Sequence, residues 1–249
     1  MIGEPRTHVA ECASTQLLLG PDDPEGAIAT TDHQTDGRGR LGRRWVDAPA
    51  TAVMMSVLLR PPRDRRAPEL SLVAAVAVAL AVEDATGLAA QIKWPNDVLL
   101  AERKVAGILA EMKGEVVVVG IGVNVNQTSE QLPVDTKVEP ASLRTLDGVV
   151  RDRETVLAGV LHRLDRCYAA WLESGLAALH EELTARDFLH GRRVGAGDAV
   201  GIAAGIDLAG RLELETASGR VQVESGEIVL DPNPSAAESP AAATSSKGT

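Results

Sequence analysis

The chain has 249 residues, of which 45% are hydrophobic and 24% charged, enough for a globular protein with a sizeable core. Its 25 basic and 35 acidic residues give a net charge of −10, which disfavours nucleic-acid binding through the phosphates. The two cysteines, Cys12 and Cys167, have no CxxC spacing, so we expect reduced thiols rather than a disulfide framework or a zinc site.

Short segments rich in Val, Ile and Leu alternate with helical patterns between residues 7 and 126, which is typical of a mixed α/β fold. A helix is expected over 15–20. Another is expected over 68–86, where Pro68 suits the first turn and Gly87 the end. Lys113-Gly114 indicates a tight hairpin turn. The strands are expected near 7–11, 28–33, 52–60, 90–93, 97–100, 104–112 and 115–123.

The apolar run 70–82 lies within the second predicted helix and is shorter than the roughly 20 residues that cross a bilayer. The sequence also opens without a basic-then-apolar leader. We therefore expect a cytoplasmic protein with no membrane segment.

Residues 126–150 are polar, contain two prolines and predict a long loop with at most short structure. Apolar residues at helical spacing from Val156 to Trp171 predict an amphipathic helix that ends at Gly175, followed by a helix over about 176–187. After Gly191, alternating apolar residues punctuated by glycines predict a small antiparallel barrel. We expect a main domain over 1–188, the barrel over 189–231 and a disordered tail over 232–249.

The segment from Gly37 to Trp45 holds four arginines and three glycines in a protein that is acidic overall. We call residues 36–45 the arginine loop. Glycines allow the backbone to approach a ligand closely, and guanidinium groups bind phosphate or carboxylate in a bidentate manner. This pattern favours an anion site over a solvated basic loop.

The loop also matches G-x-G-x-x-G, but residues 45–49 end in proline and cannot begin the helix that a dinucleotide fold requires.

Three further motifs follow the arginine loop. Residues 93–97 (Lys-Trp-Pro-Asn-Asp) place a cation, an aromatic ring, an amide and a carboxylate between two strands. Residues 104–109 begin with a lysine and continue with small and apolar residues. Residues 120–126 end an apolar strand with two glycines and two asparagines, which suits a wall that approaches a ligand closely.

In their order and spacing, residues 37–45, 93–97, 104–109 and 122–124 resemble the biotin protein ligase family, and the resemblance extends over about residues 7–231. It implies an α/β (α+β) fold, with a mixed sheet and flanking helices like the catalytic domains of class II synthetases and biotin ligases. The C-terminal barrel would be SH3-like. The N-terminal start of the pattern implies a monofunctional member without a DNA-binding domain.

The resemblance also implies the roles of individual residues. Biotin would be bound by Ser14, Thr15, Gln16, Gln34, Arg38, Gly39, Arg40, Lys104, Gly107, Ile108 and Leu109. ATP and the adenylate would be bound by Arg40, Arg43, Trp45, Asn96, Lys104, Asn124 and Ala141. Catalysis would involve Lys104, Arg38, Arg40 and Asp97. The structural alternatives are a surface lysine at 104 and turn residues at the two asparagines.

Two residues depart from the family pattern. Gln16 stands where the family has asparagine, so one hydrogen bond to the ureido ring of biotin would be rearranged. Asp36 stands where the family has alanine, and its carboxylate is expected to compete for the guanidinium of Arg38.

The implied reaction forms biotinyl-5'-AMP from biotin and ATP, with Mg²⁺ held mainly by the phosphates, and then transfers biotin to a lysine of a partner protein. Asp97 is the candidate base for that lysine, although it could instead only position other groups. The arginine loop is expected to be mobile and to order on ligand binding.

The implied partner is the biotin carboxyl carrier domain of an acyl-CoA or pyruvate carboxylase, and the chain itself would be a monomer or a weak homodimer. The rival interpretations are a lipoyl or octanoyl protein ligase, a biotin-sensing DNA repressor and a non-catalytic biotin-binding module. The arginine pattern argues against the first, the acidic charge against the second and the retained Lys104 against the third.

Overall fold

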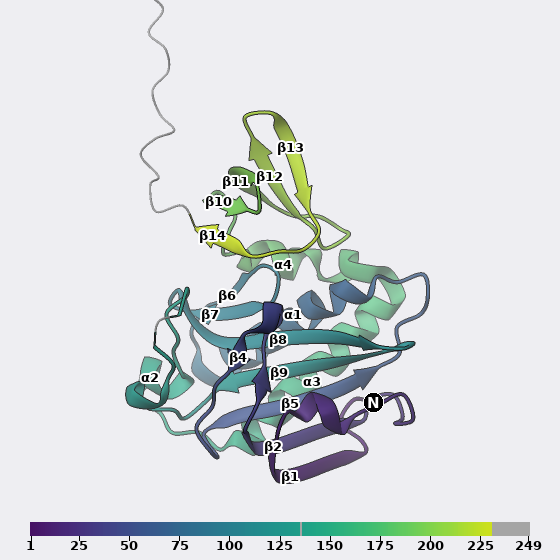
Figure 1. Ribbon diagram of the computed structural model, residues 1–249, viewed down its shortest axis with the longest axis vertical. Coiled ribbons are helices and arrows are strands. Elements are labelled where there is room, and N and C mark those ends of the chain that lie inside the picture. The colour runs from purple at the N-terminus through teal and green to yellow at the C-terminus, as the bar shows by residue number, and fades with distance from the viewer. Residues whose placement is uncertain (135, 231–249) are drawn as a thin grey trace, which may run out of the picture.

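The computed structural model of the chain describes residues 1–134 and 136–230. A seven-stranded sheet has the order β1-β2-β5-β9-β8-β7-β6, and all neighbours are antiparallel except β1 and β2 (Figure 1). This confirms the mixed sheet and its seven predicted strands. The strands are β1 (Arg6–Cys12), β2 (Ile28–Gln34), β5 (Ala52–Leu59), β6 (Ala90–Lys93), β7 (Asp97–Leu100), β8 (Arg103–Lys113) and β9 (Val116–Asn124).

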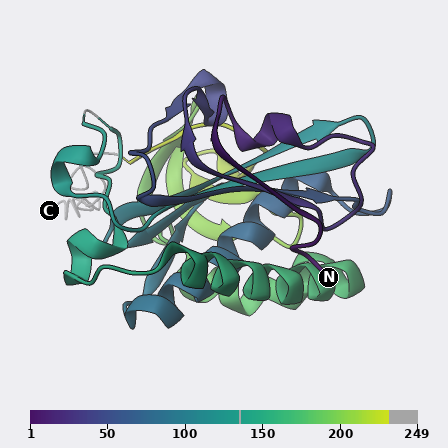
Figure 2. The same cartoon turned by 90° about the horizontal axis from the view of Figure 1, so that it is seen from below.

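Two long helices, α1 (Leu70–Thr86) and α3 (Arg153–Ser174), pack together on one face of this sheet (Figure 2). Helix α1 is apolar on nearly every side because it lies between the sheet and α3, and Gly87 ends it in the left-handed conformation, with φ 72°. The Asp152 side chain accepts a hydrogen bond from the Thr155 amide and caps the start of α3. Both helices confirm the sequence-based prediction, and none of the described helices is long and apolar enough to span a membrane.

The opposite face of the sheet carries short elements instead of long helices. A single turn of 3₁₀ helix, η1 (Thr15–Leu18), replaces the longer helix predicted over 15–20. The arginine loop forms the small hairpin β3 (Gly37–Arg38) and β4 (Arg44–Trp45) around the 3₁₀ turn η2 (Arg40–Gly42). No helix follows the loop, which is consistent with rejecting the dinucleotide fold.

Several predictions in the second half of the chain are refined by the structure. The β8–β9 turn is formed by Gly114 and Glu115, because Lys113 already pairs with Val116. The helix predicted over 176–187 is divided into a 3₁₀ turn and α4. The short elements are η3 (Ala67–Glu69), η4 (Ser129–Gln131), α2 (Leu143–Asp147), η5 (Gly175–Leu179) and α4 (His180–Arg186).

The predicted C-terminal antiparallel unit is a five-stranded sheet of order β13-β12-β11-β10-β14. It is joined to the larger sheet by the Trp94 indole, which donates to the Gly210 carbonyl at 2.9 Å, and by the Lys93 ammonium, which donates to the Ile228 carbonyl at 3.4 Å. The tail predicted over 232–249 lies outside the described residues, and the division into domains at residue 188 stays a prediction. The strands are β10 (Arg193–Ala196), β11 (Ala199–Ile206), β12 (Leu212–Thr216), β13 (Gly219–Val223) and β14 (Ile228–Leu230).

Both cysteines are free: Cys167 is buried in the core, and Cys12 is half-buried. Burial raises the pKa of the Cys167 thiol to about 11. The described residues contain no group of three or more His, Cys, Asp or Glu side chains that could hold a metal ion.

Candidate functional site

The arginine loop crosses the sheet face opposite α1 and α3 (Figures 1 and 2), and a cavity of about 380 Å³ lies between this loop and the strands. All the site residues assigned from the sequence line it, with the exception of Ala141. Ala141 is buried beside the cavity, where its carbonyl accepts a hydrogen bond from the Asn124 amide at 3.0 Å. The sequence motifs therefore converge on one space, although they extend from Ser14 to Asn124 along the chain.

One end of the cavity is polar and uncharged. The Gln34 side-chain oxygen accepts a hydrogen bond from the Thr15 amide at 2.8 Å, and the Thr15 hydroxyl lies 2.8 Å from the hydroxyl of Ser56. All three side chains are buried, as is Ser14. Fixed neutral donors and acceptors of this kind suit a polar ring without charge. Ser56, in the middle of β5, was not expected from the sequence, because a single serine in an apolar strand carries no motif.

Glycines from β8 and β9 form part of the cavity wall beside Lys104. A Cβ atom on Gly122 would lie 2.6 Å from the Trp45 indole, and one on Gly107 would lie 2.7 Å from the same ring. The indole thus rests directly on the two backbones, and its Nε1 is buried without a hydrogen-bond partner among the described residues. The sequence predicts that Gly122 lets the wall approach a ligand closely. In the ligand-free structure, the group that lies against this glycine is the Trp45 indole.

Gly122→Ala is expected to displace Trp45, because the overpacked contact would cost about 1–3 kcal/mol of folding free energy, and thereby to weaken ligand binding. The measurement is binding of biotin, the ligand that the sequence resemblance implies, by calorimetry, with tryptophan emission reporting the displaced indole. Gly159→Ala is the matched control, because a Cβ atom there meets nothing within 4 Å. Equal binding by the two variants would show that the contact between Gly122 and Trp45 is not required.

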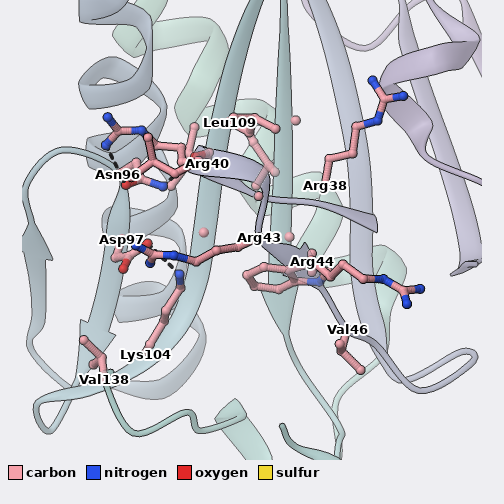
Figure 3. Close-up of a pocket in the computed structure, with 18 of the residues that line it drawn as sticks. Arg38, Arg40, Arg43, Arg44, Val46, Asn96, Asp97, Lys104, Leu109 and Val138 are labelled. Atoms are coloured by element: carbon pink, nitrogen blue, oxygen red, sulfur yellow. Dashed lines mark hydrogen bonds and ion pairs between the residues drawn. The ribbon is translucent and has the colours of Figure 1, made fainter. Parts of the chain in front are cut away.

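The other end of the cavity is cationic. The Lys104 ammonium lies 2.6 Å from Asp97 Oδ1 and 5.7 Å from the centre of the Trp45 ring. Figure 3 shows Arg40 and Arg43 reaching the same side of the cavity, where the Arg40 guanidinium donates to Asn96 Oδ1 at 3.3 Å. Burial lowers the pKa values of Arg40 and Lys93, against the opposing effect of Asp97. Several partly dehydrated cations facing one space are suited to an anionic ligand.

Arg38 does not join this group in the ligand-free structure. Its side chain is exposed and points away from Lys104 in Figure 3, so a role for Arg38 at the reacting atoms requires the loop to move. The expected competition of Asp36 for Arg38 is wrong. Asp36 instead lies 3.7 Å from Arg44, whose guanidinium also donates to the Thr35 carbonyl.

The loop over 126–142 closes one side of the cavity by pairing with the start of β8. The Lys104 amide donates to the Glu139 carbonyl at 2.8 Å, and the Lys104 carbonyl accepts from the Ala141 amide at 2.9 Å. Asn124 also has protein partners for both sides of its amide, since its oxygen accepts from Gln127 at 2.9 Å. Asn124 ends β9 and is not a turn residue, and its contact with the adenylate stays a prediction.

A carboxylate from the C-terminal sheet, Glu227, was missed by sequence reasoning. It lines the cavity and forms ion pairs with Arg43 of the arginine loop and, at 2.7 Å, with Lys137 of the 126–142 loop. The hydrogen bond from Lys137 holds the pKa of Glu227 below its usual value. Glu227 therefore connects three segments around the cavity mouth. Glu227 follows Arg43 by 184 positions in the chain, so no local sequence motif indicates their contact.

Glu227→Gln is expected to loosen the arginine loop before ligand binds. Because exposed ion pairs contribute about 0.2–1 kcal/mol each, amide exchange over 36–45 should rise by about two- to tenfold. Hydrogen exchange followed by mass spectrometry measures this. Glu224→Gln is the control, because Glu224 pairs with Arg66 and Arg211 and not with the arginine loop. Unchanged exchange in Glu227→Gln would mean that these ion pairs do not restrain the loop.

Comparison with known proteins gives two family matches. Residues 13–127 match the biotin/lipoate A/B protein ligase family, and residues 190–231 match the biotin protein ligase C-terminal domain. The bifunctional ligase/repressor BirA of Bacillus spizizenii is 36% identical, over 86% of this chain and 69% of that protein. The biotin–[acetyl-CoA-carboxylase] ligase of Mycobacterium tuberculosis is also 36% identical, over 83% and 80%.

The fold is similar to a solved structure as well. The biotin protein ligase from Aquifex aeolicus in complex with biotin and ATP superimposes with a TM-score of 0.83 and 31% identity, covering 92% of this chain and 99% of that one.

Proposed function

Because the chain belongs to the biotin protein ligase family, we propose that it forms biotinyl-5'-AMP from biotin and ATP and transfers the biotinyl group to a lysine of a partner. The partner proposed is the biotin carboxyl carrier domain of an acyl-CoA or pyruvate carboxylase. Since the reaction consumes ATP, the cytoplasm is the proposed compartment, and a monomer or a weak homodimer is the proposed state.

The observation that carries this proposal is the two-ended cavity. Its neutral end, around Thr15, Gln16 and Gln34, suits the ureido ring of biotin, and Ile108 and Leu109 supply apolar surface for the tail. Its cationic end, around Lys104 and Arg40, suits a carboxylate beside a phosphate. A ligand that spans the cavity would place its carboxylate at the cations.

The first step brings two anions together, since the biotin carboxylate attacks the α-phosphate of ATP and pyrophosphate leaves. We assign to Lys104 and Arg40 the stabilisation of charge that develops on the phosphate oxygens. Arg43 would contact the nucleotide once it leaves Glu227, and Arg38 would join after the loop closes. Mg²⁺ would be held mainly by the ATP phosphates, whose charge it would reduce. Closure of the loop would also keep water from the mixed anhydride.

In the second step, a lysine of the carrier attacks the carbonyl of the adenylate and AMP leaves. With a pKa of ~10.4, only about one lysine in a thousand is neutral near pH 7, so a group that accepts its proton or holds the amine would help. Asp97 lies at the mouth of the cationic end, beside Lys104. We propose that Asp97 positions Lys104 in the first step and contacts the incoming amine in the second.

The test is incubation with biotin, ATP, Mg²⁺ and a carrier domain, with the mass of the carrier as the measurement. We expect a mass gain of one biotinyl group, which is absent when the acceptor lysine is replaced by arginine. Lipoate and octanoate in place of biotin test the related acyl ligases. Biotin binding without pyrophosphate release would instead identify a binding module.

A further inference from the structure

Lys113, at the end of β8, holds the segment that carries Thr15 and Gln16. Its ammonium donates to the Gln16 carbonyl at 2.5 Å and to the Leu19 carbonyl at 2.9 Å. The Gln16 carbonyl lies within η1 and the Leu19 carbonyl belongs to its C-cap residue, and a helix of a single turn leaves such acceptors without intrahelical partners. Lys113 does not line the cavity and therefore acts on it only through η1.

The side chain of Gln16 is held at a second point. Its Nε2 donates to the Leu109 carbonyl at 2.8 Å, and a Cβ atom on Gly120 would lie 2.9 Å from the same nitrogen. Gln16 Oε1 is then buried without a hydrogen-bond partner among the described residues. A buried acceptor without a partner is costly, so this oxygen is placed to receive a donor from a bound ligand.

We propose that Lys113 is a positioning residue for biotin recognition: by fixing the main chain of Gln16, it directs Gln16 Oε1 to an N–H of the ureido ring. The inference rests on the proposed function and deepens it. Gly120 provides the space that the longer glutamine needs in place of asparagine. Three residues of this chain, Lys113, Gly120 and Gln16, thus form one recognition unit, of which only Gln16 touches the ligand.

The first test is the substitution Lys113→Met, which keeps the length of the side chain and removes its donors. The dissociation constant for biotin should rise about tenfold, because the buried carbonyl of Gln16 loses its donor and η1 loses its fixed position. The dissociation constant for ATP should stay within about twofold. Lys113→Arg should restore most of the biotin affinity. Both constants are measured by calorimetry on the full chain.

The matched control is Arg63→Met. Arg63 is an exposed cation that pairs with Glu115 at the tip of the same hairpin, and it does not contact η1. It should leave both constants unchanged. Where Lys113→Met fails to fold, as judged by circular dichroism, Lys113→Gln carries the same test, since its neutral amide is too short to reach both carbonyls. Biotin binding equal to that of the parent in the folded variant would overturn the inference.

The second test asks whether Lys113 acts through Gln16. In a Gln16→Ala background, Lys113→Met should weaken biotin binding by less than about twofold, because the acceptor that it positions is gone. A full tenfold effect in that background would overturn the inference and identify a general effect on stability. If the parent chain itself bound no biotin, the proposed function would be wrong. That result differs from parent-like biotin binding by Lys113→Met, so failure of the function and failure of the inference can be distinguished.

Discussion

Lys104→Ala is expected to lower the rate of biotin-dependent pyrophosphate release by about 10²- to 10³-fold, the usual cost of removing one preorganised donor at a developing charge. Lys104 is held between Asp97 and the Trp45 ring, and its main chain is fixed by Glu139 and Ala141. Its ammonium therefore needs little reorganisation when the phosphate arrives. The rate is measured with saturating biotin and ATP, so that binding and chemistry are separated.

Arg103→Ala is the matched control for this variant. Arg103 is the preceding residue of β8, and its guanidinium lies 3.5 Å from Glu139 instead of lining the cavity. Its loss should change the rate by less than about threefold. Adenylation by Lys104→Ala at a rate comparable to that of Arg103→Ala would show that Lys104 is only a surface lysine, the structural alternative that its sequence position left open.

The strands and long helices could be predicted from the sequence because their signals are local. A short apolar run marks β5, a run rich in valine marks β9, and the apolar run between Pro68 and Gly87 marks α1. Four motifs also indicated the cavity: three combine glycine with charged or amide residues, and the fourth, residues 93–97, combines a cation, an aromatic ring, an amide and a carboxylate. The turn at Gly114 was displaced by one residue because strand pairing, and not composition, decides where a hairpin turns.

The parts of the site that could not be predicted depend on contacts between distant segments. Glu227 lies in a loop before β14, and only the packing of the C-terminal sheet brings it to the cavity. Ser56 lies in an apolar strand, and β5 buries it against the Thr15 hydroxyl. The direction of Arg38 and the pairing of Asp36 with Arg44 follow from how the arginine loop folds in the absence of ligand. Such side-chain directions depend on contacts within the folded loop, and the sequence alone does not determine them.

Asp97→Asn should slow both adenylation and transfer. The ratio of the two rate losses reports whether Asp97 acts on Lys104, on the incoming amine or on both. The substitution keeps the shape of the side chain and removes the charge that lies 2.6 Å from Lys104. Loss of this partly buried ion pair leaves the Lys104 ammonium without its counter-charge, so adenylation should slow by about ten- to 100-fold through a displaced Lys104. A pyrophosphate assay without carrier measures this effect alone.

Transfer from preformed biotinyl-5'-AMP to the carrier should slow by more, about 10²-fold or above, if Asp97 also accepts the proton of the attacking lysine. Raising the pH tests this directly. As more of the carrier lysine becomes neutral without help, the transfer defect of Asp97→Asn should shrink, whereas the adenylation defect should not. A transfer defect that is independent of pH and equal to the adenylation defect would restrict Asp97 to positioning Lys104. A defect in transfer alone would show that Asp97 acts on the incoming amine and not through Lys104, despite the ion pair between them in the ligand-free protein.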